Sequence, residues 1–142
     1  MGIISYMRTE AKVIRERDPA IKSNLEVILY PGFKAVLYYR LAHKLYLRKH
    51  FFLARWISQR TARRTGIEIH PGAVIGKGLF IDHGNGVVIG TGAKILGSFT
   101  VGEGARIGAG TVVLKEVPAG ATAVGTQGHS GIVLRPWPEE CR

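Results

Sequence analysis

Aliphatic residues recur every six positions through the second half of this chain. They form two series, and neighbours within each series are six residues apart: Ile69, Ile75 and Ile81, then Ile89, Ile95, Val101, Ile107 and Val113. The step between the series, from Ile81 to Ile89, is eight residues, so two additional residues lie within the stretch HGNGVV. A repeat this regular indicates a fold built from stacked copies of one small unit.

The six-residue period is typical of a left-handed parallel β-helix. In that fold each unit is one short strand and a turn, and three units close a triangular coil whose aliphatic residues point inward and stack about 4.8 Å apart. Small residues let the chain turn at the corners, and a glycine follows the aliphatic residue at Gly76, Gly90, Gly102 and Gly108. The eight units give slightly less than three coils, which is near the minimum of about three repeats for a stable array.

The first 66 residues have the spacing of helices instead. Pro31-Gly32 separates one predicted helix from the next, and Asp18 is a plausible helix cap with Pro19 in the first turn. We expect three or four helices paired as hairpins, with apolar side chains at helical spacing: Val36, Leu37, Leu41, Leu45, Phe52, Leu53, Trp56 and Ile57. The predicted fold class is therefore α+β, with a helical region (1–66), a β-helix domain (67–125) and a divergent tail (126–142).

The positive charge is concentrated in the helical half. The net charge is +10, and residues 1–66 carry 14 Lys and Arg against 4 Asp and Glu, whereas residues 67–142 carry 6 of each. A basic surface can attract nucleic acid, anionic lipid or a phosphorylated small molecule, but a solvated helix surface is the plainer interpretation. We expect neither a nucleic-acid nor a membrane partner, because no recognition motif is present and charges interrupt the apolar start of the chain. A single cysteine, Cys141, favours a reducing compartment, the cytoplasm.

Asp82 and His83 are the candidates for chemistry, because they lie where the six-residue register slips. Histidine changes charge near neutral pH and suits a general base, although an isolated Asp-His pair can equally form a polar turn. Three longer stretches separate these two interpretations: RERDPAIKSNLEVILYPGFKAVLYYRLAHKLY, TGIEIHPGAVIGKGLFIDHGNGVVIG and GARIGAGTVVLKEVPAGATAVG. Together they closely resemble bacterial serine O-acetyltransferases, the family that acetylates L-serine from acetyl-CoA at the first committed step of cysteine synthesis. The resemblance runs from about Arg15 to Gly125.

The resemblance implies a role for several residues. His83 corresponds to the general base, Glu68 to the carboxylate that orients it, and Asp82 to an acidic residue that holds serine. Acetyl-CoA, as co-substrate, is implied to contact small residues and lysines of the later coils: Ala93, Lys94, Gly108, Ala109 and Lys115. The alternative for both lysines is plain solvation. His70 is interpreted as a structural corner residue, and His43 and His50 as packing or solvated residues of the helices.

The chain departs from the family pattern immediately after Gly90. Family members continue with further coils, a GGTGK loop and an Arg-His-Pro segment that helps bind the serine carboxylate, whereas here Gly90 leads directly into Thr91. An internally shortened, catalytically weak or inactive homologue that acts as an assembly protein is therefore the competing hypothesis. The tail after Gly125 also differs, so we do not expect a partnership with the sulfhydrylase that uses O-acetylserine.

The remaining expectations concern assembly and metal. The family implies a homotrimer, or a dimer of trimers, with CoA at the interface between subunits. A trimeric metalloenzyme such as a carbonic anhydrase on the same scaffold needs three well-spaced histidines, whereas the β-helix offers only two, His70 and His83, and His129 belongs to the divergent tail. We therefore expect no metal site.

Overall fold

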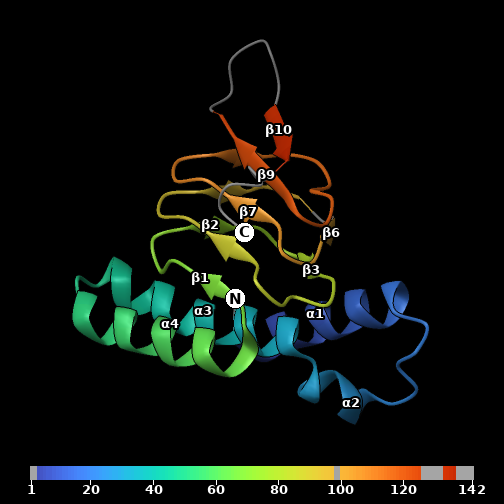
Figure 1. Cartoon of the computed structure of the whole chain (residues 1–142). Helices are drawn as coiled ribbons and strands as arrows, with labels where there is room; N and C mark the ends of the chain where they lie inside the picture. The colour runs from blue at the N-terminus through green and yellow to red at the C-terminus, as the bar shows by residue number, and fades with distance from the viewer. Residues whose placement is uncertain (1–2, 98–99, 126–132, 137–142) are drawn as a thin grey trace.

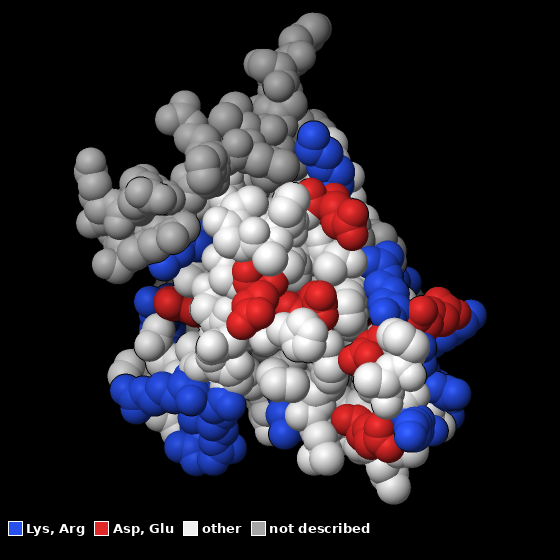
Figure 2. Space-filling model, turned by 45° about the vertical axis from the view of Figure 1, so that its right-hand side comes forward, with Lys and Arg blue, Asp and Glu red and all other residues white. Residues whose placement is uncertain are grey.

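A computed structural model describes residues 3–97, 100–125 and 133–136. Four helices form the base of the molecule, and a stack of short parallel strands rises from them (Figure 1). The predicted α+β class with a left-handed parallel β-helix is confirmed. Figure 2 shows Lys and Arg side chains gathered mainly around the helical base, as the uneven charge of the sequence predicts.

The helices begin and end at recognisable signals. They are α1 (Ile3–Arg17), α2 (Asn24–Leu29), α3 (Pro31–Leu47) and α4 (Phe51–Thr65). Pro31 occupies the first turn of α3, so the predicted break at Pro31-Gly32 is confirmed. Gly66 ends α4 in the left-handed region at φ 71°, which glycine adopts without a steric penalty.

The predicted helix start at Asp18 is wrong. The side chain of Asp18 accepts a hydrogen bond from the Ala20 backbone N–H at 2.9 Å, but this closes a turn rather than a helix. Helix α2 begins at Asn24, because the Ser23 hydroxyl accepts the Glu26 backbone N–H at 3.3 Å and caps the helix. The segment 18–22 is therefore a loop that can approach the β-helix.

Eight two-residue strands form the three faces of the β-helix. They are β1 (Glu68–Ile69), β2 (Val74–Ile75), β3 (Phe80–Ile81), β4 (Val88–Ile89), β5 (Lys94–Ile95), β6 (Thr100–Val101), β7 (Arg106–Ile107) and β8 (Val112–Val113), followed by β9 (Ala121–Val124) and β10 (Val133–Pro136). The strand order is β1-β4-β7-β9-β10 on face A, β2-β5-β8 on face B and β3-β6 on face C. Every pairing is parallel except β9 with β10, which is antiparallel.

The predicted inward positions form the core. All eight aliphatic residues of the repeat are at most 5% exposed, and they belong to one hydrophobic cluster. The stack is longer than predicted, because Val117 pairs with Val101 and Ala123 pairs with Ile107. The chain covers the last turn in 16 residues, from Ile107 to Ala123, whereas Ile89 to Ile107 takes 18. A shortened corner after Val113 therefore closes the third coil and starts a fourth.

Polar contacts fix the helices against the first coil. From α3, the Tyr39 hydroxyl donates to the Ala73 carbonyl and the Arg40 guanidinium donates to the Gly76 carbonyl at 2.6 Å. From α4, the Ser58 hydroxyl donates to the Ile69 carbonyl at 2.7 Å. The buried Glu10 of α1 accepts the Gly78 backbone N–H at 2.9 Å. These bonds satisfy backbone groups of the coil that would otherwise be buried without partners.

Candidate active site

The two additional residues of the repeat form a compact loop between the first and second coils. This insert loop, residues 82–87, leads from β3 on face C to β4 on face A. The Gly84 N–H bonds to the Asp82 carbonyl, and the Gly86 N–H bonds to the Gly66 carbonyl at 2.9 Å. A Cβ on Gly84 would lie 2.4 Å from Cδ1 of the buried Ile67, so the loop packs closely on the coil below. The insert loop is therefore held at both ends.

His83 occupies the outer edge of the insert loop. Its φ is 50°, in the left-handed region that is uncommon for a residue with a Cβ and that concentrates at functional sites. The side chain is 77% exposed, and its Nε2 lies 3.6 Å from Oδ1 of Asp82. The imidazole is therefore open to a substrate and has a carboxylate beside it.

Asp18 and Tyr30 also lie near this loop, and sequence reasoning did not include them in the site. Burial raises the pKa of the Tyr30 phenol, the Asp18 and Asp82 carboxylates raise it further, and a hydrogen bond with the His83 backbone opposes the rise. The Tyr30 ring stacks on Phe80 with 6.1 Å between ring centres. Tyr30 therefore lies at the insert loop, and both carboxylates act on its hydroxyl electrostatically.

Glu68 has a different partner from the one predicted. Its Oε1 lies 3.9 Å from Nη2 of Arg55 on α4, rather than beside His83. Glu68 also influences His70, whose pKa is lowered by burial and by Arg55, with Glu68 acting in the opposite direction. Nδ1 of His70 accepts the Gly72 backbone N–H at 2.9 Å, which fits a corner residue. The pairing of Glu68 with His83 stays a prediction.

The five residues predicted to contact acetyl-CoA lie away from His83. Ala93 is fully buried in the core, backbone included, so within one chain it offers no surface to a ligand, contrary to its predicted contact with acetyl-CoA. Lys94 is exposed on face B, and Lys115 is exposed just after β8 of the same face. Gly108 and Ala109 follow β7 at the corner that leads from face A to face B. Within one chain, the insert loop occupies the corner between faces C and A instead.

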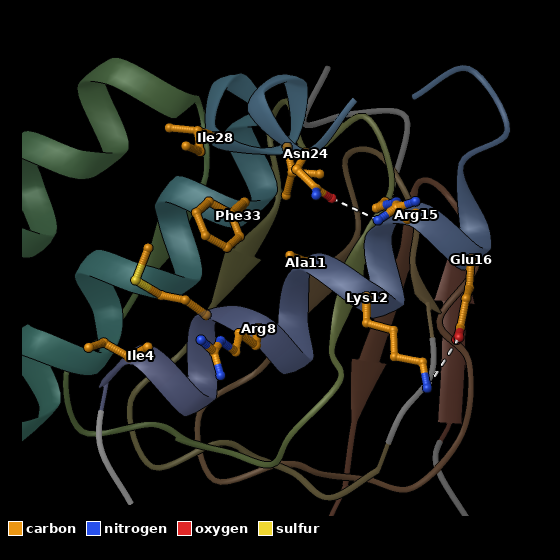
Figure 3. A pocket seen from close by; sticks show the side chains of 11 residues that line it. Ile4, Arg8, Ala11, Lys12, Arg15, Glu16, Asn24, Ile28 and Phe33 are labelled. Carbon is orange, nitrogen blue, oxygen red and sulfur yellow. Dashed lines mark hydrogen bonds and ion pairs between the residues drawn. The ribbon is translucent and has the colours of Figure 1, made fainter. Parts of the chain in front are cut away.

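A groove of about 750 Å³ lies on the helices rather than at the insert loop (Figure 3). Its lining includes Met7, Ala11, Val27 and Phe33, and Figure 3 shows two of its cations already engaged: Arg15 with Asn24 at 2.7 Å and Lys12 with Glu16 at 3.8 Å. None of the residues that line it belongs to the insert loop, so it is not the candidate active site.

Comparison with known proteins identifies the family to which this chain belongs. The protein-family description "Bacterial transferase hexapeptide (six repeats)" matches residues 80–115. The serine acetyltransferase of Bacillus licheniformis is 45% identical over 162 residues, which cover 87% of this chain and 75% of the relative. This chain belongs to the serine acetyltransferase family.

Solved serine acetyltransferases share the fold. The Neisseria gonorrhoeae serine acetyltransferase in complex with serine matches 94% of this chain and 68% of that chain, with 31% identity and a TM-score of 0.58. A serine acetyltransferase in complex with CoA matches 94% of this chain and 69% of that chain, with 32% identity and a TM-score of 0.58. Solved structures of the family therefore include one complex with serine and one with CoA.

The serine acetyltransferase alignment also supports the predicted internal shortening. It runs over 162 positions, whereas 87% of the 142 residues is about 124 residues, so about 38 positions of the Bacillus licheniformis enzyme have no counterpart here. The β4–β7 register nevertheless pairs Val88 with Arg106 and Ile89 with Ile107, so the second and third coils stack without interruption. The shortening therefore leaves a continuous coil stack.

Among the described residues, no helix is both long and apolar enough to cross a membrane. Those residues likewise contain no cluster of histidine, cysteine, aspartate and glutamate that could hold a metal ion. His129, the third histidine of the metalloenzyme hypothesis, lies outside the described residues.

Proposed function

We propose that this chain transfers the acetyl group of acetyl-CoA to the hydroxyl of L-serine and yields O-acetylserine for cysteine synthesis. Membership of the serine acetyltransferase family, at 45% identity over most of the chain, carries the proposal. The exposed His83, held beside Asp82 on a left-handed turn, supplies a side chain for the chemistry.

His83 acts as the general base in this proposal. It removes the proton of the serine hydroxyl as the oxygen attacks the thioester carbonyl of acetyl-CoA. When the tetrahedral intermediate collapses, the carbon–sulfur bond breaks, and the imidazolium returns the proton to the departing CoA thiolate. The orienting carboxylate is Glu68, which must exchange its 3.9 Å ion pair with Arg55 for a contact with His83.

The carboxylates of Asp82 and Asp18 support the placement of the substrate amino group. The Asp82 carboxylate lies 3.6 Å from the His83 imidazole, and Asp18 and Asp82 both raise the pKa of Tyr30, so the proposal places a negative region next to His83. The ammonium group of serine is attracted to this region, which leaves the serine hydroxyl free to face the imidazole. Asp82 and Asp18 are thus the proposed serine-binding residues.

A homotrimer would bring the predicted acetyl-CoA residues to His83, although they lie apart within one chain. Lys94 and Lys115 belong to face B, whereas the insert loop lies between faces C and A. A neighbouring copy that places face B against the insert loop would assemble both halves of the site at the subunit interface. We propose this arrangement, with Gly108 and Ala109 along the pantetheine arm, in the cytoplasm.

The shortening favours a second candidate, a weak or inactive homologue that acts in assembly. About 38 positions are missing, and by resemblance they include the arginine that orients the serine carboxylate. Orientation accounts for up to roughly 7–11 kcal/mol of barrier reduction in well-positioned reactions, so its loss can be severe.

Steady-state turnover of acetyl-CoA and L-serine distinguishes the two candidates. If His83 is the base, His83→Ala lowers kcat/KM by about 10²- to 10⁴-fold. The matched control is His50→Ala. His50 is an exposed histidine at the start of α4, so its replacement should leave turnover unchanged. Turnover of the unaltered chain that is no faster than that of His83→Ala would contradict the enzyme proposal and favour the inactive homologue.

A further inference from the structure

The predicted apolar stripe on α4 faces outward in the structure. Trp56 is 55% exposed and Leu41 of α3 is 42% exposed, whereas the buried residues of α4 are Ala54, Ser58 and Thr61. Together with Tyr38, these outward residues line a pocket of about 470 Å³ between α3 and α4. Small-molecule pockets are typically about 300–1,000 Å³ and are lined largely by apolar and aromatic groups.

Three cations complete the lining of this hairpin pocket. They are Lys34 on α3 and Arg60 and Arg64 on α4, and the lining contains no acidic side chain. The guanidinium carbon of Arg60 lies 5.7 Å from the centre of the Trp56 ring, so this cation is held against the aromatic wall. None of the ion pairs found among the described residues involves these three side chains.

Helix electrostatics explains only part of this charge. Arg64 lies in the last turn of α4, where cations are favoured by the helix dipole. Arg60 and Arg64, however, are four residues apart on one helix face, a spacing at which like charges repel by about 0.2–0.5 kcal/mol. Lys34 lies near the beginning of α3, where a cation is disfavoured. An anion bound between the three cations would reduce both the repulsion between Arg60 and Arg64 and the unfavourable interaction of Lys34 with the dipole of α3.

We propose that the hairpin pocket binds a nucleotide, with its base against the Trp56 and Tyr38 rings and its phosphate among Lys34, Arg60 and Arg64. Arginine suits phosphate because its planar fork donates two parallel hydrogen bonds. The same face of a second copy is a poorer occupant, because it would bring like charges together. The pocket lies on the helices, away from Lys94 and Lys115 on the coils, so it is separate from the proposed acetyl-CoA site.

Calorimetric titration of the full chain with adenosine 5′-monophosphate tests the proposal. Acetyl-CoA is left out, because it carries an adenine nucleotide itself and would compete for the hairpin pocket, and binding needs no turnover. We expect a Kd on the order of 10–100 µM, and at least about tenfold weaker binding of adenosine or inorganic phosphate alone. The double variant Arg60→Gln/Arg64→Gln should weaken nucleotide binding by about tenfold or more.

Arg63→Gln is the matched control, since Arg63 is an exposed arginine of the same helix that does not line the pocket. It should bind the nucleotide as the unaltered chain does. Equal binding of phosphate and nucleotide, undiminished binding by the double variant, or no binding at about millimolar nucleotide would each overturn the proposal. Failure of the serine acetylation assay would leave it untouched.

Discussion

Replacement of Gly90 by alanine tests how closely the second and third coils stack across the shortened junction. A Cβ at position 90 would lie 2.7 Å from the backbone nitrogen of Ala109 and 3.0 Å from its Cα. Ordinary contact begins at 3.4 Å, so the two coils would have to separate by about 0.7 Å at this corner. Both opposing atoms belong to the backbone, and no side-chain rotation can relieve the overlap.

The expected cost follows from this geometry. Overpacking of a closely packed interior costs about 1–3 kcal/mol, and the 2.8 Å hydrogen bond from the Gly90 N–H to the Ile107 carbonyl would be stretched. Alanine has less backbone freedom than glycine in the unfolded chain, and this difference stabilises the folded state by about 0.4–1 kcal/mol. We expect a net loss of about 1–2 kcal/mol, or a decrease in Tm of about 4–8 °C.

Thermal unfolding followed by far-UV circular dichroism, at one protein concentration, measures the difference. Gly108→Ala is the matched control, because Gly108 occupies the equivalent corner one coil further on. Its Cβ would meet side-chain atoms of Val124 and Thr111 at 3.2 and 3.3 Å, which can move. If Gly90→Ala proves as stable as Gly108→Ala, the second and third coils do not stack as described.

Two further predictions concern titration and substrate binding. Burial raises the pKa of Tyr39 from 10.0 to about 12, so its stabilising contribution is complete below pH 10 and is lost as the pH rises through 12. In urea unfolding, the stability of the unaltered chain relative to Tyr39→Phe should fall by about 1 kcal/mol between about pH 9 and about pH 11, and a constant difference would contradict the burial of the phenol. Asp18→Asn should raise KM for serine by about tenfold with little change in KM for acetyl-CoA, since one carboxylate of the pair is lost. Asp18 also closes the turn through Ala20, and asparagine retains that hydrogen bond; an unchanged KM would remove Asp18 from the site.

The coil core could be predicted from sequence because its positions repeat. The eight aliphatic residues of the repeat, the first of which is Ile69 and the last Val113, all occupy the same position in a six-residue unit. The repeat therefore predicts that all eight point inward, and each is buried. Val117 and Ala123 follow a shortened corner that breaks the six-residue step, and the repeat therefore gave no indication of them.

The candidate site could be predicted only where its residues are neighbours in sequence. Asp82 and His83 stand at the irregular step of the repeat, which marked them directly. Asp18 is distant from them along the chain, and it acts on Tyr30 from a turn that the sequence had predicted to be the start of a helix. The exposure of Trp56 could not be predicted from the sequence either. Helical spacing identifies an apolar stripe, but it does not say whether another element covers that side of the helix.

The two ends of the coil stack are covered by structure of different kinds. Helices α3 and α4 lie against the first coil, and at the opposite end β10 runs antiparallel to β9 on face A (Figure 1). A solenoid whose terminal strands are bare exposes unpaired backbone groups that another copy can extend, and such copies grow into fibres. Because β10 runs opposite to the strands of the coils, a further coil could not continue the parallel pairing on it. On face A, β10 therefore blocks the addition of a further parallel strand from another copy.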